Sequence, residues 1–251
     1  EEQGGGMVEV NAAPGLRMHL APSFGKGRDV GGAIISTMFK PGQNGRIPVV
    51  AVTGTNGKTT TVRLISHLLS RNGMCVGMTN TDGVYVGGQV IDTGDCSGPK
   101  SARSVLLHPD VDAAVLEIAR GGVLREGLAF DRCDVAVVTN VGSGDHLGLN
   151  YITTVDDLAV LKRVIVQNVS PKGTAVLNAA DPNVASMASK CKGAVTFFTA
   201  DKFHPVMATH RAQGQAVVYV ENGCVIAAKG DFTHSIALAN IPVTMGGAIG
   251  F

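Results

Sequence analysis

The segment that most constrains the fold is an apolar run that leads into a glycine-rich turn containing a lysine. Four apolar residues, Val49–Val52, predict a central parallel strand, because such strands are buried on both faces. Apolar side chains then recur at helical spacing and stop at Asn72-Gly73, which predicts a helix from Thr59 to Arg71. In such an arrangement, backbone N–H groups and the helix N-terminus can bind phosphate. The segment therefore predicts a nucleotide-binding site.

The turn also supplies the side chains that phosphate and magnesium require. It lacks the first glycine of the common G-x-x-x-x-G-K-[ST] pattern, because Val52 stands at that position. Lys58 is expected to neutralise the outer phosphates, and the Thr59 hydroxyl is expected to bind Mg²⁺. The predicted nucleotide contacts are Gly54, Thr55, Asn56, Gly57, Lys58, Thr59 and Thr60. An ordinary strand–helix turn, the alternative, does not explain why these features coincide.

Composition restricts the class of protein. A chain of 251 residues with 45% hydrophobic residues and 33 glycines fits a loop-rich α/β protein. The net charge of +1 and the lack of a dense Lys/Arg stripe argue against nucleic-acid binding. No apolar run approaches a membrane span, and the five cysteines lack C-x-x-C spacing, which favours reduced thiols. We expect a cytoplasmic protein that binds neither nucleic acid nor a membrane.

Strands and helices alternate after a turn-rich linker at residues 41–47. This alternation predicts an α/β fold, a mostly parallel sheet with helices on both faces. Near the C-terminal edge, Asn222-Gly223 lies between two apolar runs and predicts an antiparallel hairpin. The segment around Tyr85 and Val90 is expected to be a loop. Further predicted strands are 75–78, 113–118, 135–139, 175–177 and 195–198, and further predicted helices are 101–107, 155–168 and 182–189.

Residues 1–40 are too short to form a core alone, and we expect them to be the tail of a larger domain. They contain a predicted strand at 7–10 and a predicted helix at 29–39. Glu9 and Asn11 alternate with apolar residues, so their oxygens should face one side of the strand, as a pair of metal ligands requires.

Further motifs follow the glycine-rich turn in an order that resembles the Mur ligase superfamily, which includes folylpolyglutamate synthases. They are Leu116-Glu117, Thr139-Asn140, Asp145-His146, Lys162 and the segment 177–182. The segment 9–15 resembles the final metal-binding strand of ATP-grasp ligases, and the two joined parts together resemble the cyanophycin synthetase family. The resemblance implies the C-terminal tail of an ATP-grasp domain at 1–40, a linker at 41–47 and a Mur-ligase-like ATP-binding domain at 48–251, without its C-terminal substrate domain.

The resemblance implies an ATP-dependent amide ligase that makes cyanophycin, a poly-aspartate backbone with arginine on each β-carboxylate. ATP and Mg²⁺ are the implied cofactors, and aspartate, arginine and the growing cyanophycin polymer are the implied partners, with a homo-oligomer expected. In such an enzyme this module activates the β-carboxylate as an acyl phosphate, which arginine attacks. Three alternatives remain: another Mur-type ligase (a folylpolyglutamate synthase or a peptidoglycan-precursor ligase), a non-catalytic scaffold module of a dipeptide-polymerising relative, and a regulatory P-loop switch that hydrolyses ATP without ligation.

Two metal ligands are expected near the turn. Glu117 ends an apolar strand, so its carboxylate should lie at the C-terminal sheet edge, where ligands of α/β proteins collect. A helix cap or a surface charge is the alternative for this residue. The resemblance makes His146 a second ligand, although many Mur ligases have one residue fewer before the Asp145-His146 pair. The longer segment, which contains Gly142–Gly144, is shared with cyanophycin synthetases.

The resemblance assigns roles to three more residues. Lys162 aligns with the lysine that Mur ligases carbamylate to bridge a second magnesium, and the alternative is a solvated helix lysine beside Arg163. Asn178 and Asp181 follow a predicted strand and, by resemblance, contact the adenine or ribose of ATP. The alternative for this pair is a plain Asn/Asp turn.

Overall fold

The computed structural model describes residues 4, 9–142, 147–148 and 151–244, and its chain divides into two units at Arg46 and Ile47. The first unit contains α1 (Arg17–Leu20) and α2 (Val30–Met38), neither of which has a buried residue. The side chain of Asp29 caps α2 by accepting a hydrogen bond from Gly32 N. The strand predicted at 7–10 is wrong for residues 9 and 10, which are irregular, and residues 7 and 8 lie outside the described part.

The described part of the second unit is built on one sheet of 11 strands, in the order β11-β10-β9-β8-β7-β6-β1-β5-β2-β3-β4. All neighbours between β9 and β2 in this order are parallel, and the pairs at both ends are antiparallel. The strands are β1 (Val49–Thr53), β2 (Val76–Asn80), β3 (Gly83–Val86), β4 (Gln89–Thr93), β5 (Ala113–Glu117), β6 (Cys133–Val138), β7 (Val169–Asn178), β8 (Ala194–Phe198), β9 (Ala216–Glu221), β10 (Cys224–Lys229) and β11 (Phe232–Ala237).

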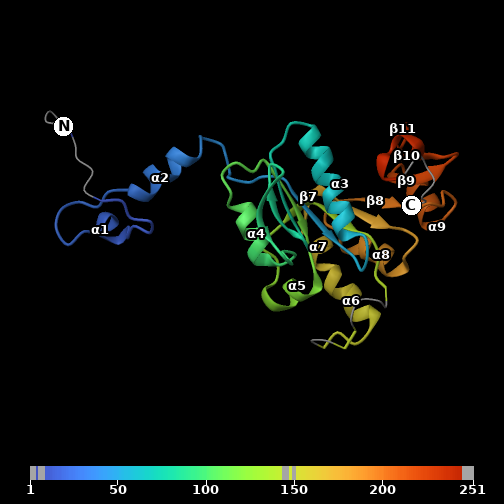
Figure 1. The fold of residues 1–251 in the computed structure, drawn as a ribbon, viewed down its shortest axis with the longest axis horizontal. Coiled ribbons are helices and arrows are strands. Elements are labelled where there is room, and N and C mark those ends of the chain that lie inside the picture. Colours follow the sequence, from blue (N-terminus) through green and yellow to red (C-terminus); the bar gives the residue numbers. More distant parts are fainter. Residues whose placement is uncertain (1–3, 5–8, 143–146, 149–150, 245–251) are drawn as a thin grey trace. The chain divides into compact units, whose positions relative to one another are not determined.

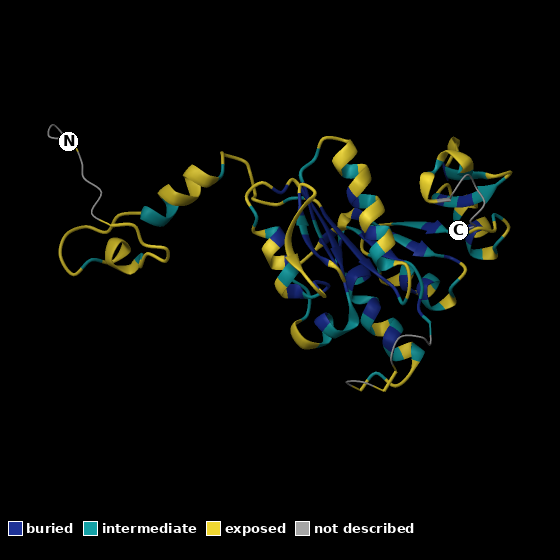
Figure 2. Ribbon diagram, in the orientation of Figure 1, coloured by how far each residue is buried: buried dark blue, intermediate teal, exposed yellow. Residues whose placement is uncertain are grey.

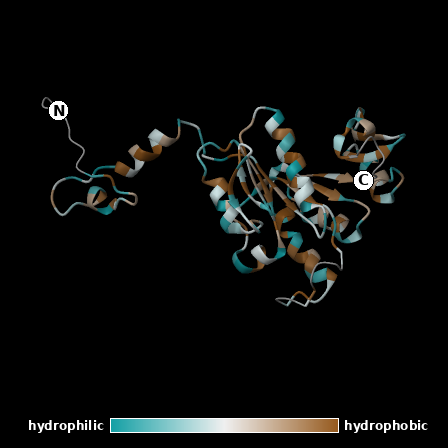
Figure 3. Cartoon of the chain, in the orientation of Figure 1, coloured by the Kyte–Doolittle hydropathy of each residue, from teal (hydrophilic) through white to brown (hydrophobic). Residues whose placement is uncertain are grey.

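Helices cover both faces of the sheet, as predicted (Figure 1). Side chains alternate across a strand, so Val50 and Val52 of β1 pack toward α3, whereas Val49 and Ala51 belong to the core of the opposite face. Buried residues lie along the central strands (Figure 2), which are also strongly hydrophobic (Figure 3). The helices of this unit are α3 (Lys58–Arg71), α4 (Pro99–Leu106), α5 (Arg120–Glu126), α6 (Val155–Lys162), α7 (Val164–Gln167), α8 (Pro182–Ser186) and α9 (Pro205–Ala212), with short 3₁₀ turns at Met187–Lys190, Leu238–Asn240 and Pro242–Thr244.

Hairpins end the sheet on both sides, and only one of them was predicted. The predicted hairpin is confirmed: Asn222 and Gly223 join β9 to β10 with φ of 49° and 70°. At the other edge, Gly87-Gly88 joins β3 to β4 with φ of 56° and 83°, so the loop expected around Tyr85 and Val90 is wrong. Every residue of β4 is exposed, so its sequence lacks the alternation that marks a half-buried strand.

Among the described residues, none of the helices combines the length and the apolar character that a membrane crossing requires. The five cysteines are free thiols. Burial, followed by the nearby charge of Asp134, raises the pKa of the Cys133 thiol to about 12, so this thiol stays protonated and unreactive at neutral pH.

Candidate functional site

The glycine-rich turn, Gly54–Gly57, lies between β1 and α3 at the carboxyl end of the central strand. Gly57 has φ of 83°, a left-handed conformation that L side chains rarely adopt. A Cβ atom at Gly54 would lie 1.9 Å from Thr139 Oγ1. The two glycines therefore allow a tight turn that packs directly against the residues after β6.

Those residues hold the turn in place through several hydrogen bonds. Thr55 N donates to Asn140 O at 2.9 Å, and Asn56 N donates to Asn140 Oδ1 at 2.9 Å. Thr139 Oγ1 donates to Asn56 O at 2.7 Å, and Gly142 N donates to Thr55 Oγ1 at 2.9 Å. The sequence motif Thr139-Asn140 had no assigned role, and its hydrogen bonds show that it shapes the glycine-rich turn.

Two lysine ammonium groups meet at one carbonyl oxygen of this turn. Lys58 Nζ donates to Gly54 O and Thr55 O, each at 3.0 Å, and Lys162 Nζ donates to Gly54 O at 3.0 Å. Lys162 is only 4% exposed, so the alternative of a solvated helix lysine is wrong. A small pocket lies beside Lys162 and is also lined by Thr53 and Arg120. The buried amine therefore lies against the glycine-rich turn.

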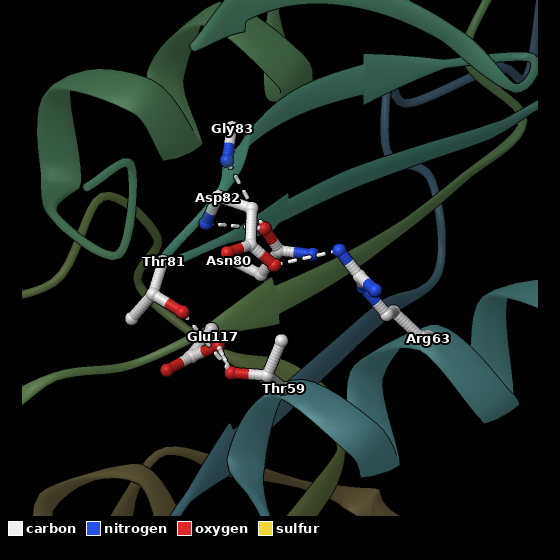
Figure 4. A network of polar contacts seen from close by, with 7 residues as sticks. All are labelled: Thr59, Arg63, Asn80, Thr81, Asp82, Gly83 and Glu117. Atoms are coloured by element: carbon white, nitrogen blue, oxygen red, sulfur yellow. Dashed lines mark hydrogen bonds and ion pairs between the residues drawn. The ribbon is translucent and has the colours of Figure 1, made fainter. Parts of the chain in front are cut away.

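Glu117, the last residue of β5, is a buried carboxylate, and one of its oxygens has no hydrogen-bond partner in the described part of the chain. It is 1% exposed, and its Oε2 accepts a hydrogen bond from Thr59 Oγ1 at 2.8 Å, while Oε1 has no hydrogen-bond partner among the described residues (Figure 4). A buried carboxylate is costly unless a cation or hydrogen bonds compensate it. Oxygen ligands suit Mg²⁺, so the Thr59–Glu117 pair fits a magnesium site.

Few protein ligands would surround such a cation. Within the described ranges, no group of three or more His, Cys, Asp or Glu residues is placed to hold a metal. Magnesium commonly binds one or two carboxylates and takes its other ligands from phosphate and water. His146, the predicted second ligand, lies outside the described residues.

The Glu117→Gln variant is expected to need about ten- to a hundredfold more magnesium for tight nucleotide binding, because it removes the negative charge and keeps the side-chain shape. Titration of Mg²⁺ into the protein with ADP measures this requirement. The control is Glu126→Gln, which changes a carboxylate of α5 whose side chain is 48% exposed. An unchanged magnesium requirement for Glu117→Gln would exclude the ligand role.

The predicted adenine or ribose contacts, Asn178 and Asp181, support the segment after β6. Asn178 Nδ2 donates to Thr139 O at 2.9 Å, and Asp181 Oδ2 accepts from Val141 N at 2.6 Å. Asp181 also caps α8 through Oδ1, which accepts from the N–H groups of Asn183 and Val184. The two side chains thus bind the segment that itself contacts the glycine-rich turn. Their contact with nucleotide stays a prediction.

In the first unit, Glu9 and Asn11 contact each other. Asn11 Nδ2 donates to Glu9 Oε1 at 2.8 Å, and both residues are exposed. The two side chains therefore lie on one side of the chain even though residues 9 and 10 form no strand. Their role in metal binding stays a prediction.

Sequence reasoning missed one part of the site, the turn between β2 and β3. Thr81 Oγ1 lies 3.2 Å from Thr59 Oγ1, and Asp82 forms an ion pair with Arg63 of α3 at 2.6 Å. Asn80-Thr81-Asp82-Gly83 is a turn-type sequence that begins two residues after the end of the strand predicted at 75–78, but this pattern alone does not separate a functional turn from a connecting one. β2 runs parallel to β5, and β5 runs parallel to β1, so all three strands end at the same sheet edge. Polar residues that follow any of these strands are therefore candidates for the site.

Comparison with known proteins agrees with this geometry. The family model described as the Mur ligase middle domain matches residues 52–240. Cyanophycin synthetase from Nostoc sp. is 49% identical over 251 residues, which cover 100% of this chain and 28% of that protein. Cyanophycin synthetase from Geminocystis herdmanii is 51% identical over 246 residues, which cover 97% of this chain and 28% of that protein. The chain thus spans little more than a quarter of these relatives.

The fold is also found among solved structures. The structure of a UDP-N-acetylmuramoyl-L-alanyl-D-glutamate–2,6-diaminopimelate ligase matches with a TM-score of 0.57 and 19% identity, and the match covers 76% of this chain and 39% of that one. This likeness confirms the α/β fold, with its mostly parallel sheet and its helices on both faces. By its sequence and its fold, the chain belongs to the Mur ligase middle-domain family.

Proposed function

We propose that this chain is the ATP-binding module of a cyanophycin synthetase, an ATP-dependent amide ligase that joins arginine to the β-carboxylates of a poly-aspartate backbone. The observation that carries the proposal is the near 50% identity to cyanophycin synthetases over both units of the chain. The site geometry supports the same reaction class, because a lysine-bearing turn beside a buried carboxylate suits transfer of a phosphoryl group.

In the proposed reaction, ATP converts the β-carboxylate into an acyl phosphate, and the α-amine of arginine displaces phosphate to form the amide. The backbone N–H groups of the turn and the start of α3 would bind the phosphates. Lys58 Nζ donates hydrogen bonds to carbonyl oxygens of its own turn. In the reaction it would donate to phosphate oxygens in their place. Thr59 and Glu117 would hold Mg²⁺, which would supply positive charge to neutralise the transferring phosphoryl group.

The remaining assignments belong to the same proposal. His146 is the proposed second metal ligand, and Lys162 is the proposed site of carbamylation. Asn178 and Asp181 would lie near the adenine or ribose. Residues 1–40 would be the tail of an ATP-grasp domain, with Glu9 and Asn11 as its metal ligands. The whole enzyme would be a cytoplasmic homo-oligomer that acts on aspartate, arginine and the growing cyanophycin polymer.

Substrate choice tests this function directly. The whole enzyme is given ATP, Mg²⁺ and a β-aspartyl acceptor peptide with arginine, lysine, glutamate or a preformed aspartyl-arginine dipeptide. We expect release of ADP and phosphate that depends on arginine, together with an isopeptide product seen by mass spectrometry. A preference for glutamate would instead indicate a folate-type ligase. Exclusive use of the dipeptide would indicate a polymerising relative, and ATP hydrolysis without any amino acid would indicate a P-loop switch.

A further inference from the structure

The turn between β2 and β3 contacts α3 through two pairs of side chains beside the proposed magnesium site (Figure 4). Thr59 and Arg63 are four residues apart on α3, so their side chains lie on the same face of the helix. Thr59 Oγ1 lies 3.2 Å from Thr81 Oγ1, and Arg63 Nη2 lies 2.6 Å from Asp82 Oδ2. The helix that carries the magnesium-binding hydroxyl therefore holds two consecutive residues of the turn.

The contacts of the Thr59 hydroxyl fix the direction of its proton. A hydroxyl has one O–H donor and two acceptor lone pairs. Thr59 donates its proton to Glu117 Oε2 at 2.8 Å, so the contact with Thr81 requires the Thr81 hydroxyl to be the donor. One lone pair of Thr59 Oγ1 remains, and the chain from Thr81 through Thr59 to Glu117 determines where it points. The position of Thr81 thus affects the geometry of a proposed metal ligand.

Two further sets of contacts hold Thr81 in its position. Asn80 is fully buried, and its Oδ1 accepts from Asp82 N at 2.8 Å and from Gly83 N at 3.1 Å. This pattern, an Asx turn, fixes the backbone from the inside. The Arg63–Asp82 ion pair fixes the same turn from the solvent side, with side-chain exposures of 54% and 52%.

We propose that Arg63 and Asp82 are positioning residues for the magnesium site, which hold the turn so that Thr81 orients the Thr59 hydroxyl. The inference rests on the proposed function, because it takes Thr59 and Glu117 as the residues that bind magnesium with the nucleotide. An exposed ion pair usually contributes little to stability. Partners of metal ligands, in contrast, change metal affinity about ten- to a hundredfold when they are removed. An ordinary surface ion pair therefore predicts little change in metal affinity when it is removed, whereas a positioning role predicts a clear loss.

The test compares ADP binding with Mg²⁺ and with EDTA, measured by calorimetry, in the Arg63→Ala and Asp82→Ala variants. We expect the Kd of ADP in Mg²⁺ to rise about tenfold in each variant. In EDTA, where no metal is bound, the Kd should stay within about twofold, because neither residue belongs to the phosphate-binding turn. The double variant should bind no more weakly than either single variant, because the pair acts as a unit. Arg63→Lys should restore part of the affinity, and Thr81→Val should reproduce the loss.

A matched control is available in the Arg103–Glu126 ion pair, which joins α4 to α5 at 3.5 Å with side-chain exposures of 53% and 48%. Arg103→Ala should leave ADP binding unchanged in Mg²⁺ and in EDTA. If Arg63→Ala and Asp82→Ala behave like this control, or if they weaken binding equally in EDTA, the positioning role is wrong. If the unmodified protein binds ADP without any dependence on Mg²⁺, the proposed magnesium site fails together with the inference. The Mg²⁺ dependence of the unmodified protein therefore distinguishes failure of the magnesium site from failure of the positioning role alone.

Discussion

A Lys58→Met variant of the whole enzyme is expected to lose arginine addition by at least about a hundredfold, because methionine has a similar length and no charge. The Lys58 ammonium lies within the turn, where it donates to Gly54 O and Thr55 O, so it is already placed beside the backbone that we propose binds phosphate. Addition of aspartate should continue, because the proposal places that step at a separate ATP-grasp site. Incorporation of radiolabelled arginine and of radiolabelled aspartate into polymer measures the two activities separately.

The control for this variant is Lys172→Met, which changes an exposed lysine of β7. It should leave both activities unchanged. Retained arginine incorporation in Lys58→Met would show that the turn does not bind the reacting phosphates. Equal loss of both activities would show that the two proposed sites are not independent.

A Lys162→Ala variant is expected to lose most of its arginine addition, by about a hundredfold. Lys162 is buried and lies beside a small pocket, and its amine reaches the turn at Gly54 O. A carbamate on this amine would replace a cation by an anion able to share magnesium with Glu117 or His146. Short carboxylic acids should occupy the space left in the alanine variant and restore part of the activity.

The arginine variant separates the carbamate from the positive charge. Lys162→Arg keeps a cation and a donor for Gly54 O but cannot form the same carbamate, so it should stay inactive and should not respond to added acids. Full activity of Lys162→Ala would refute the carbamate. Rescue of Lys162→Ala by alkylamines in place of carboxylic acids would show that the ammonium itself is the required group.

Much of the fold could be predicted because burial and turn chemistry leave local marks in the sequence. Val49–Val52 are apolar without interruption because β1 is central and covered on both faces. Asn222-Gly223 supplies the positive φ angles that a short hairpin needs. The helix predicted at 155–168 was wrong in one respect, because it divides into α6 and α7 at Arg163.

The site was less accessible to sequence reasoning, because its geometry depends on contacts between distant residues. Glu117 could be placed at the sheet edge from its position at the end of an apolar strand. That its Oε1 has no hydrogen-bond partner among the described residues depends on packing, which the sequence does not specify. The burial of Lys162 depends on how α6 docks against the turn, which the periodicity of its own helix does not specify. Thr81 and Asp82 were missed because a turn after a strand has no mark that separates a functional turn from a connecting one.

The hydrogen bonds between the glycine-rich turn and Asn140 also affect when, during synthesis, the turn can form. Asn56 and Asn140 are 84 residues apart in sequence, and β1 pairs with β5 and β6, both of which follow it. During synthesis, the turn leaves the ribosome long before the residues that shape it. Pairing between distant segments is slow compared with local structure, because it requires closure of a long loop. A nascent chain should therefore acquire affinity for ATP late and abruptly, when β6 joins the sheet.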